Sequence, residues 1–406
     1  MREIGLTISS FFLEKEIKKY VVFFFILLFL SDFLMKFMKF GSLNFYFRLG
    51  GVIKIIFEGF LIISIFKTGL KKIFIFPILL LILFFTINHI IFFPDSIFNR
   101  NLLQEILRGD IYHLNKYIFI ILFIAVLSTS SKKIEIVNII VNIFLFVLYF
   151  NSIFILIGFF FEINYLKAFP YSSRFGYTGL FVKSGDAVLL YILAIIYQYT
   201  QYLKGKSILP VTYFLFIIIL SGKKIGLLIF PLLYITHLCM YSRNKNFFRF
   251  LGLLIISLLI FFKELIINLF IKLFPFWVPL YEKNGFWSVV FSKRDLLIKN
   301  TFGFISENWS FLNFLFGGSN FSKLRVELDP IDLFIYFGLF GSAIYISFFT
   351  RQIILPIKNK IILSLLIGYV IIGMTYGIFL NNIMLIVCLY VFSIYYRYDY
   401  KLETKE

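Results

Sequence analysis

Residues 136–161 read IVNIIVNIFLFVLYFNSIFILIGFFF, an apolar run of 26 residues without one charged side chain. A helix needs about 20 apolar residues to cross the hydrocarbon core of a bilayer, so this run predicts a membrane span. The whole chain has the same character: 61% of its 406 residues are hydrophobic, 15% are charged, and the mean hydropathy is +0.94. A soluble globular core would not hide so much apolar surface. The sequence therefore predicts an all-α, polytopic integral membrane protein.

Similar apolar runs recur on both sides of this segment. Counting each run as one helix predicts about 12 transmembrane helices. The predicted spans are residues 20–35, 49–66, 73–93, 117–128, 136–161, 186–203, 208–220, 225–241, 250–270, 331–349, 361–376 and 381–396. Because no small-residue cleavage site follows the first run, we expect it to be retained as a helix rather than removed as a signal peptide.

The basic residues between these runs predict the orientation of the chain. Lys and Arg resist translocation, so short basic connections remain in the cytoplasm. If both termini are cytoplasmic, every second connection is short and basic. The basic residues of these connections are Lys67, Lys71, Lys72, Lys132, Lys133, Lys204, Lys206, Arg243, Lys245, Arg249, Arg351, Lys358, Lys360, Arg397, Lys401 and Lys405. We attribute the net charge of +19 to contact with membrane lipids and with an anionic ligand, and we exclude nucleic acid as a partner.

The longest connection follows the ninth predicted span and divides the chain into three regions. Residues 1–261 hold the first nine helices, residues 262–330 form a large extracytoplasmic loop, and residues 331–406 hold the last three helices and a cytoplasmic tail. The loop carries eight basic residues and several aromatic ones, and it leads into an acidic cluster at 327–332. Loops of this length are usually folded and functional. We therefore expect the loop to contribute to the functional site.

Four stretches on the predicted outer side combine glycine, serine and basic residues. They are residues 171–176 (YSSRFG), 221–224 (SGKK), 293–295 (KRD) and 316–319 (FGGS), the last followed by Glu327 and Asp329. The two cysteines, Cys239 and Cys388, lie inside apolar runs without His or Cys at ligand spacing, which argues against a disulfide framework or a zinc site.

The order of these stretches resembles that in bacterial O-antigen polymerases and O-antigen ligases, which are membrane glycosyltransferases. The similarity covers roughly residues 174–341. It rests first on an Arg followed by Gly at 174–176 and on a Ser-Gly-basic turn at 221–224, where this chain has Lys in place of the usual Arg. It rests also on Arg294, which precedes the turn at 316–319, and on a helix with Gly-x-x-Gly at 338–341. Ligases carry a His near the end of the long loop, where this chain has Glu327 and Asp329. The resemblance therefore favours a polymerase over a ligase.

The resemblance implies an enzyme of the bacterial cytoplasmic (inner) membrane that acts in O-antigen, lipopolysaccharide or capsule biosynthesis. It implies as substrate an oligosaccharide linked to polyprenyl (undecaprenyl) diphosphate, which is polymerised at the outer face of the membrane. Membrane lipids and a chain-length regulator are the other implied partners. The diphosphate bond supplies the energy, so neither a cofactor nor a metal is expected.

This chemistry assigns roles to six residues. Transfer from a diphosphate carrier builds negative charge on the leaving group, and fixed guanidinium and ammonium groups stabilise such charge. We predict that Arg174, Lys223, Lys224 and Arg294 bind the diphosphate. The acceptor hydroxyl is a weak nucleophile and needs a general base, for which the candidates are Glu327 and Asp329.

The basic candidates also have structural interpretations. Lys223 and Lys224 lie next to an apolar run, where lysines commonly extend to the membrane interface. Arg174 has Glu162 and Asp186 as candidate partners for a structural ion pair.

The acidic candidates have structural interpretations as well. Asp329 precedes Pro330, as expected of a residue that caps a helix. Together with Glu327, Asp329 also has the spacing of a minimal metal site, although a third ligand is missing. Within a predicted span, Lys54 and Glu58 are four residues apart and are expected to neutralise each other.

Two other function classes remain open from the sequence. One is a transporter or flippase of lipid-linked oligosaccharides, since about twelve helices are common among transporters. No repeat relates the two halves of this chain, and its long loop is one-sided, which speaks against a symmetrical carrier. The other is a non-catalytic assembly partner; the coexistence of basic and acidic residues on the predicted outer side favours an enzyme.

Overall fold

The computed structural model describes residues 2–40, 49–92, 107–170, 172, 174–241, 277–318, 324–377 and 379–398. Helices make up most of these ranges, which contain no β-strand and one isolated antiparallel bridge between Lys167 and Tyr177. The predicted all-α class is confirmed.

Each predicted apolar run within the described residues forms a helix. In chain order these are α1 (Arg2–Phe40), α2 (Leu49–Thr68), α3 (Lys72–Phe92), α6 (Tyr112–Thr129), α7 (Lys133–Phe160), α8 (Ser184–Leu203), α9 (Leu209–Leu220), α10 (Lys224–Leu227), α11 (Ile229–Tyr241), α17 (Asp329–Phe349), α18 (Lys360–Met374) and α19 (Ile383–Tyr398). The run at 225–241 is divided between α10 and α11. The predicted span at 250–270 lies outside the described residues.

Among the described residues, six segments are long and apolar enough to cross a membrane. They are Glu16–Met38, Leu49–Lys67, Lys72–His89, Gly109–Thr129, Lys133–Phe160 and Asp329–Ile354. Shorter apolar helices accompany them. The outer surface of α2 exposes Ile55, Ile56 and Phe66, the last by 85%, which is unfavourable in water and suits contact with lipid. The chain is therefore a multi-pass membrane protein.

The centre of the helix bundle is formed by α8 and α19. Almost every residue of α8 from Gly185 to Ile196 is buried, as expected of a helix that is apolar on all sides. It packs against α9, α18 and α19. These contacts fix the position of the segment that precedes α8, which carries part of the site.

A buried asparagine attaches that preceding segment to the bundle. Asn151 on α7 donates its amide to the Thr178 carbonyl at 3.1 Å and to the Tyr191 hydroxyl at 2.9 Å. Its side-chain oxygen accepts the Leu180 N–H at 2.7 Å. A fully satisfied amide in an apolar core specifies one arrangement of the chain. The loop between α7 and α8 is thereby held against the helices.

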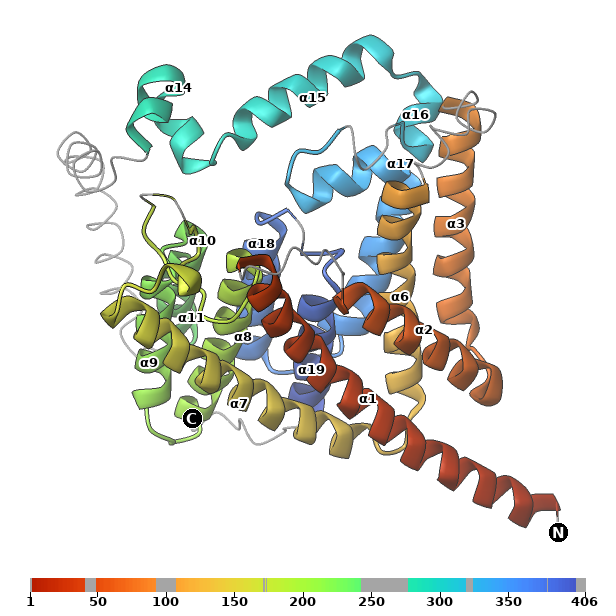
Figure 1. The fold of residues 1–406 in the computed structure, drawn as a ribbon. Coiled ribbons are helices and arrows are strands. Elements are labelled where there is room, and N and C mark those ends of the chain that lie inside the picture. The colour runs from red at the N-terminus through yellow and green to blue at the C-terminus, as the bar shows by residue number, and fades with distance from the viewer. Residues whose placement is uncertain are drawn as a thin grey trace.

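The described part of the predicted long loop contains three helices: α14 (Val278–Val290), α15 (Arg294–Asn308) and α16 (Phe311–Phe316). Figure 1 shows them across one end of the bundle, with the marked N- and C-terminal ends toward the opposite end. The Gly318 N–H donates to the Ile335 carbonyl at 3.1 Å, where α17 is kinked at Gly338. The turn that follows α16 is therefore fixed to a membrane helix.

Candidate functional site

Two turns from distant parts of the chain meet at a pair of glycines. Gly176 and Gly222 have φ angles of 141° and 64°. A Cβ atom on Gly222 would lie 2.2 Å from the Phe175 carbonyl oxygen, so no larger residue fits. This junction places Arg174 on one turn close to Lys223 on the other.

Two aromatic rings lie among three of the predicted basic residues. The Arg174 guanidinium is 4.0 Å from the centroid of the Phe169 ring, and the Lys223 ammonium is 4.4 Å from the same centroid. Arg174 also lies 4.8 Å from the Trp277 centroid, and Lys224 lies 3.5 Å from it. Each cation–π contact contributes about 0.5–2 kcal/mol. The rings thus hold three mutually repelling cations together, and we call Arg174, Lys223 and Lys224 the basic cluster.

Burial and mutual repulsion both act on the basic cluster. The pKa of the Lys223 ammonium is lowered to about 8, first because burial removes water and then because Arg174 and Arg294 repel its charge. Glu327 acts in the opposite direction. Burial also lowers the pKa of Arg174, although a guanidinium remains protonated at any physiological pH. An anion bound here would offset this repulsion.

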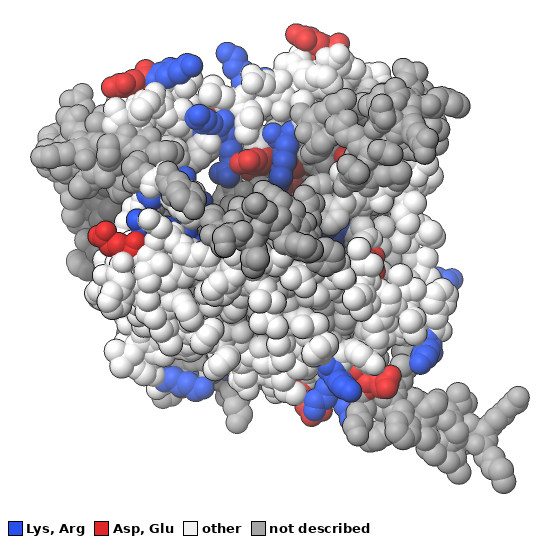
Figure 2. Space-filling view, viewed as in Figure 1, with Lys and Arg blue, Asp and Glu red and all other residues white. Residues whose placement is uncertain are grey.

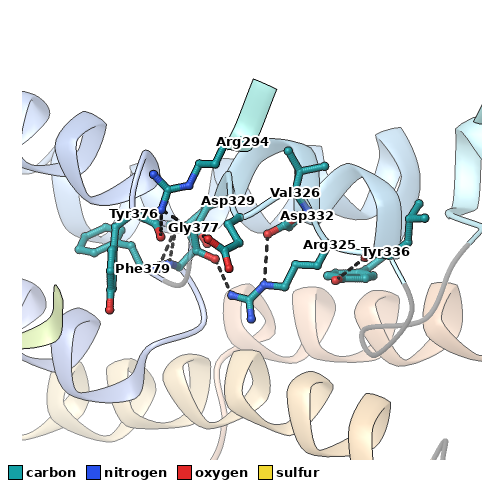
Figure 3. Close-up of polar contacts among 12 residues, drawn as sticks. Arg294, Arg325, Val326, Asp329, Asp332, Tyr336, Tyr376, Gly377 and Phe379 are labelled. Atoms are coloured by element: carbon teal, nitrogen blue, oxygen red, sulfur yellow. Dashed lines mark hydrogen bonds and ion pairs between the residues drawn. The ribbon is translucent and has the colours of Figure 1, made fainter. Parts of the chain in front are cut away.

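Arg294 comes from a strained turn at the start of α15. Ser292 and Lys293 have left-handed φ angles of 55° and 71°, which are unfavourable for residues other than glycine. The Arg294 Nη2 atom lies 3.6 Å from the Glu327 carboxylate and donates to the Tyr376 carbonyl at 3.3 Å (Figure 3). Its Nε atom is buried and has no hydrogen-bond partner in the described part of the chain. That N–H is available to an anionic ligand.

Glu327 occupies a second strained position. Its φ angle is 60°, and a Cβ on Gly377 would lie 2.1 Å from the Glu327 carbonyl oxygen. Only glycine fits opposite Glu327, and Gly377 itself has a φ of 82°. The Glu327 side chain is 53% exposed, so its carboxylate reaches both water and Arg294.

Asp329 points into the protein instead. It is 2% exposed, and its Oδ2 atom accepts the Phe379 N–H at 2.8 Å and the Leu380 N–H at 3.2 Å (Figure 3). The expectation that Asp329 caps its own helix is wrong: it is the first residue of α17, and it makes no capping hydrogen bond there. Its side chain holds the connection between α18 and α19.

Arg325 and Asp332 shape the segment that carries Glu327. The Asp332 Oδ1 atom accepts the Val326 N–H at 2.8 Å, and its Oδ2 atom lies 3.6 Å from the Arg325 Nε atom. Arg325 also donates to the Gly377 carbonyl at 2.6 Å (Figure 3). These bonds fix the backbone on the side of Glu327 that faces α18 and α19.

The structure therefore brings most of the predicted site together. Lys223 interacts electrostatically with Arg174, Arg294 and Glu327. Figure 2 shows Lys and Arg side chains, with an acidic side chain among them, gathered in a recess beneath the uppermost layer. Lys224 donates to the Val289 carbonyl at 2.6 Å. Asp329 is buried and accepts its hydrogen bonds from the connection between α18 and α19 instead.

Several residues of the site were not assigned a role from the sequence. Phe169 and Trp277 hold the basic cluster, while Tyr376 and Gly377 contact Arg294 and Arg325. An aromatic residue near a basic loop is too common in this chain to be selected by pattern. Asp186, which the sequence offered as a partner for Arg174, hydrogen-bonds with Tyr376.

Comparisons with protein-family models, with curated proteins and with solved structures found no match to this chain.

Proposed function

We propose that this protein is a polysaccharide polymerase of the O-antigen or capsule type. It transfers a glycan from a polyprenyl diphosphate carrier onto a lipid-linked repeat unit. The observation that carries the proposal is the convergence of Arg174, Lys223, Lys224 and Arg294 beside the exposed carboxylate of Glu327. A cationic recess with one exposed carboxylate matches what glycan transfer from a diphosphate requires.

The basic residues act on the leaving group. In the reaction, the bond between the anomeric carbon and the diphosphate oxygen breaks, and the lipid diphosphate departs with the electron pair. Its growing charge is stabilised by Lys223 and by the guanidinium groups of Arg174 and Arg294, which suit bidentate contact with phosphate oxygens. Cations that are already fixed beside one another before the reaction need little reorganisation during it.

Glu327 acts on the acceptor. The acceptor hydroxyl oxygen forms the new bond to the anomeric carbon, and its proton passes to the Glu327 carboxylate. Glu327 suits this role because it is half exposed and lies 3.6 Å from Arg294, so the proton acceptor and the diphosphate ligand are adjacent. Asp329, whose Oδ2 atom is occupied by two backbone N–H groups, is proposed to be structural.

The proposed location is the outer face of the bacterial cytoplasmic membrane, with about twelve spans and both termini in the cytoplasm. Two observations support it. Figure 1 shows the layer of α14–α16 at one end of the bundle, while both marked chain ends point toward the other. The connections after α6 and α8, which carry Lys132 and Lys204, lie at that other end as well. The functional layer would then lie in the extracytoplasmic loop at 262–330.

Glycan analysis of a deletion strain tests this function. A polymerase deletion should leave single repeat units, and the intact gene should restore long chains, whereas Arg294→Ala should not. Long chains that remain on the lipid carrier would instead identify an O-antigen ligase. Repeat units retained on the cytoplasmic side would identify a transporter or flippase. Unchanged polymer in the deletion strain would refute the proposal.

A further inference from the structure

Three lysines from separate elements are electrostatic neighbours of one another. They are Lys54 on α2, Lys116 on α6 and Lys183 immediately before α8, and we call them the lysine trio. Lys54 and Lys116 are partly buried, and Lys183 is exposed. None of the three has a carboxylate within ion-pair distance in the described part of the chain.

The expected partner of Lys54 is engaged elsewhere. Glu58 accepts a hydrogen bond from the Asn115 amide at 2.7 Å, so the predicted pair of Lys54 with Glu58 is wrong. Membrane helices rarely carry a lysine without a partner or a function, because a charge there is costly.

The nearest carboxylates also have other partners. Asp32 accepts the Val182 N–H at 3.0 Å, and Asp186 hydrogen-bonds with Tyr376. Both remain electrostatic neighbours of Lys54, and their negative charge offsets part of the trio's charge. Neither approaches closely enough to form an ion pair.

Like charges surround Lys116. Its electrostatic neighbours are Lys183, Lys54 and Arg325, with Asp186 as the one opposite charge among them in the described residues. Cations that repel each other, two of them partly buried, form a ready binding site for an anion, since the anion removes the repulsion.

The lysine trio is separate from the basic cluster but adjacent to the same carboxylate. Arg325, a neighbour of Lys116, precedes Glu327 by two residues. Tyr376 interacts electrostatically with both Asp186 and Glu327. Glu327 is therefore linked to both groups of cations: it interacts electrostatically with Lys223 of the basic cluster, and it lies two residues from Arg325, a neighbour of Lys116.

We infer that the lysine trio binds a second diphosphate, that of the lipid-linked acceptor. The inference rests on the proposed function: a reaction between two lipid-linked glycans involves two diphosphates at once, and the basic cluster provides for one. The surface of α2 beside Lys54 suits the lipid chain, because Ile55 and Ile56 are 67% and 68% exposed. Two cation sites near one base would hold donor and acceptor together.

Counting bound lipids tests this. The full-length protein in nanodiscs is titrated with undecaprenyl diphosphate, and the number bound is read by native mass spectrometry. We expect two per chain in the wild type and one in Lys116→Gln. Exposed Lys183→Gln, which carries little risk to folding, should weaken one of the two sites about tenfold or more. Lys204→Gln, at the far end of α8, is the matched control and should retain both.

The remaining outcomes separate the two proposals. Two tightly bound lipids in both Lys116→Gln and Lys183→Gln would overturn the lysine trio as a site. If the wild type binds one lipid, and Arg174→Gln loses it while Lys116→Gln retains it, the lysine trio is not a site. The polymerase proposal would remain intact in that case. No binding in the wild type would overturn both. If Lys116→Gln weakens phosphatidylglycerol and not undecaprenyl diphosphate, the trio binds ordinary membrane lipid and the inference is wrong.

Discussion

Replacing Glu327 by Gln removes the proposed base and keeps the size of the side chain. An amide does not accept the acceptor proton, and general base catalysis contributes about 10²–10⁴-fold to a rate. This range corresponds to about 3–5 kcal/mol of activation free energy. We therefore expect polymer synthesis by Glu327→Gln to fall at least a hundredfold.

The same change should leave the fold intact. The pair with Arg294 is 3.6 Å long, and the Glu327 side chain is 53% exposed, so water screens the interaction. Exposed ion pairs contribute about 0–1 kcal/mol to stability. The thermal unfolding midpoint in detergent and the amount of protein in the membrane should stay close to those of the wild type.

Asp329→Asn is the matched control, because it also converts a carboxylate to an amide in the same segment. The Asp329 Oδ2 atom accepts two backbone N–H groups in a buried place, and weakening such bonds costs about 1–3 kcal/mol. We expect less stable protein but normal activity per folded molecule. Asp329→Ala should be more severe, since the N–H groups of Phe379 and Leu380 then lose their acceptor.

Polymer length and yield on gels, normalised to folded protein, separate these effects. Activity in Glu327→Gln together with inactive but stable Asp329→Asn would assign the base to Asp329. Full activity in both variants would refute the reasoning, because acceptor activation would then not depend on a carboxylate of this segment.

Three further predictions follow from the same geometry. Arg294→Lys keeps the charge but loses the planar guanidinium that binds phosphate through two hydrogen bonds, so polymer yield should fall about tenfold or more at normal protein level. An unchanged yield would show that Arg294 has no specific role in diphosphate binding. Lys223, with its pKa lowered to about 8, is cationic below that pH and neutral above it, so the KM for the donor should rise as the pH increases through about 8. Lys223→Arg should abolish this rise, because a guanidinium stays protonated. The same rise in Lys223→Arg would exclude Lys223 as its cause. Ser306→Cys on α15 should react with an impermeant thiol reagent in intact cells and Ser207→Cys should not, whereas the reverse pattern would invert the proposed orientation.

The helices were predictable because they depend on local composition. An uncharged run such as residues 136–161 has few alternatives to a helix in a membrane, and the structure forms α7 there. The motif residues were predictable for a related reason: Gly222 beside Lys223 marks a tight turn with a basic side chain. Glycine at such a turn reflects a backbone requirement that the sequence displays directly.

Contacts between distant segments were not predictable. Asp329 resembles a capping residue because it precedes Pro330, but its acceptor atom faces two N–H groups about fifty residues further along the chain. Lys54 and Glu58 have ideal helical spacing, yet Asn115 from another helix binds Glu58. In each case the local sequence allows more than one partner for the carboxylate, and tertiary packing decides which one it binds.

The distribution of backbone strain links the fold to the proposed chemistry. In the described ranges, four residues other than glycine have left-handed φ angles, and three of them are Ser292, Lys293 and Glu327. The first two set the direction of Arg294, and the third is its ion-pair partner. A left-handed conformation costs about 1–2 kcal/mol per residue and persists only where the surrounding contacts enforce it. Here Gly377 and the bonds of Arg325 provide that enforcement. The backbone is thus unfavourable next to Arg294 and at Glu327, the two residues that would position the leaving group and the acceptor. Such strain is expected if function, rather than stability, determines where these side chains lie.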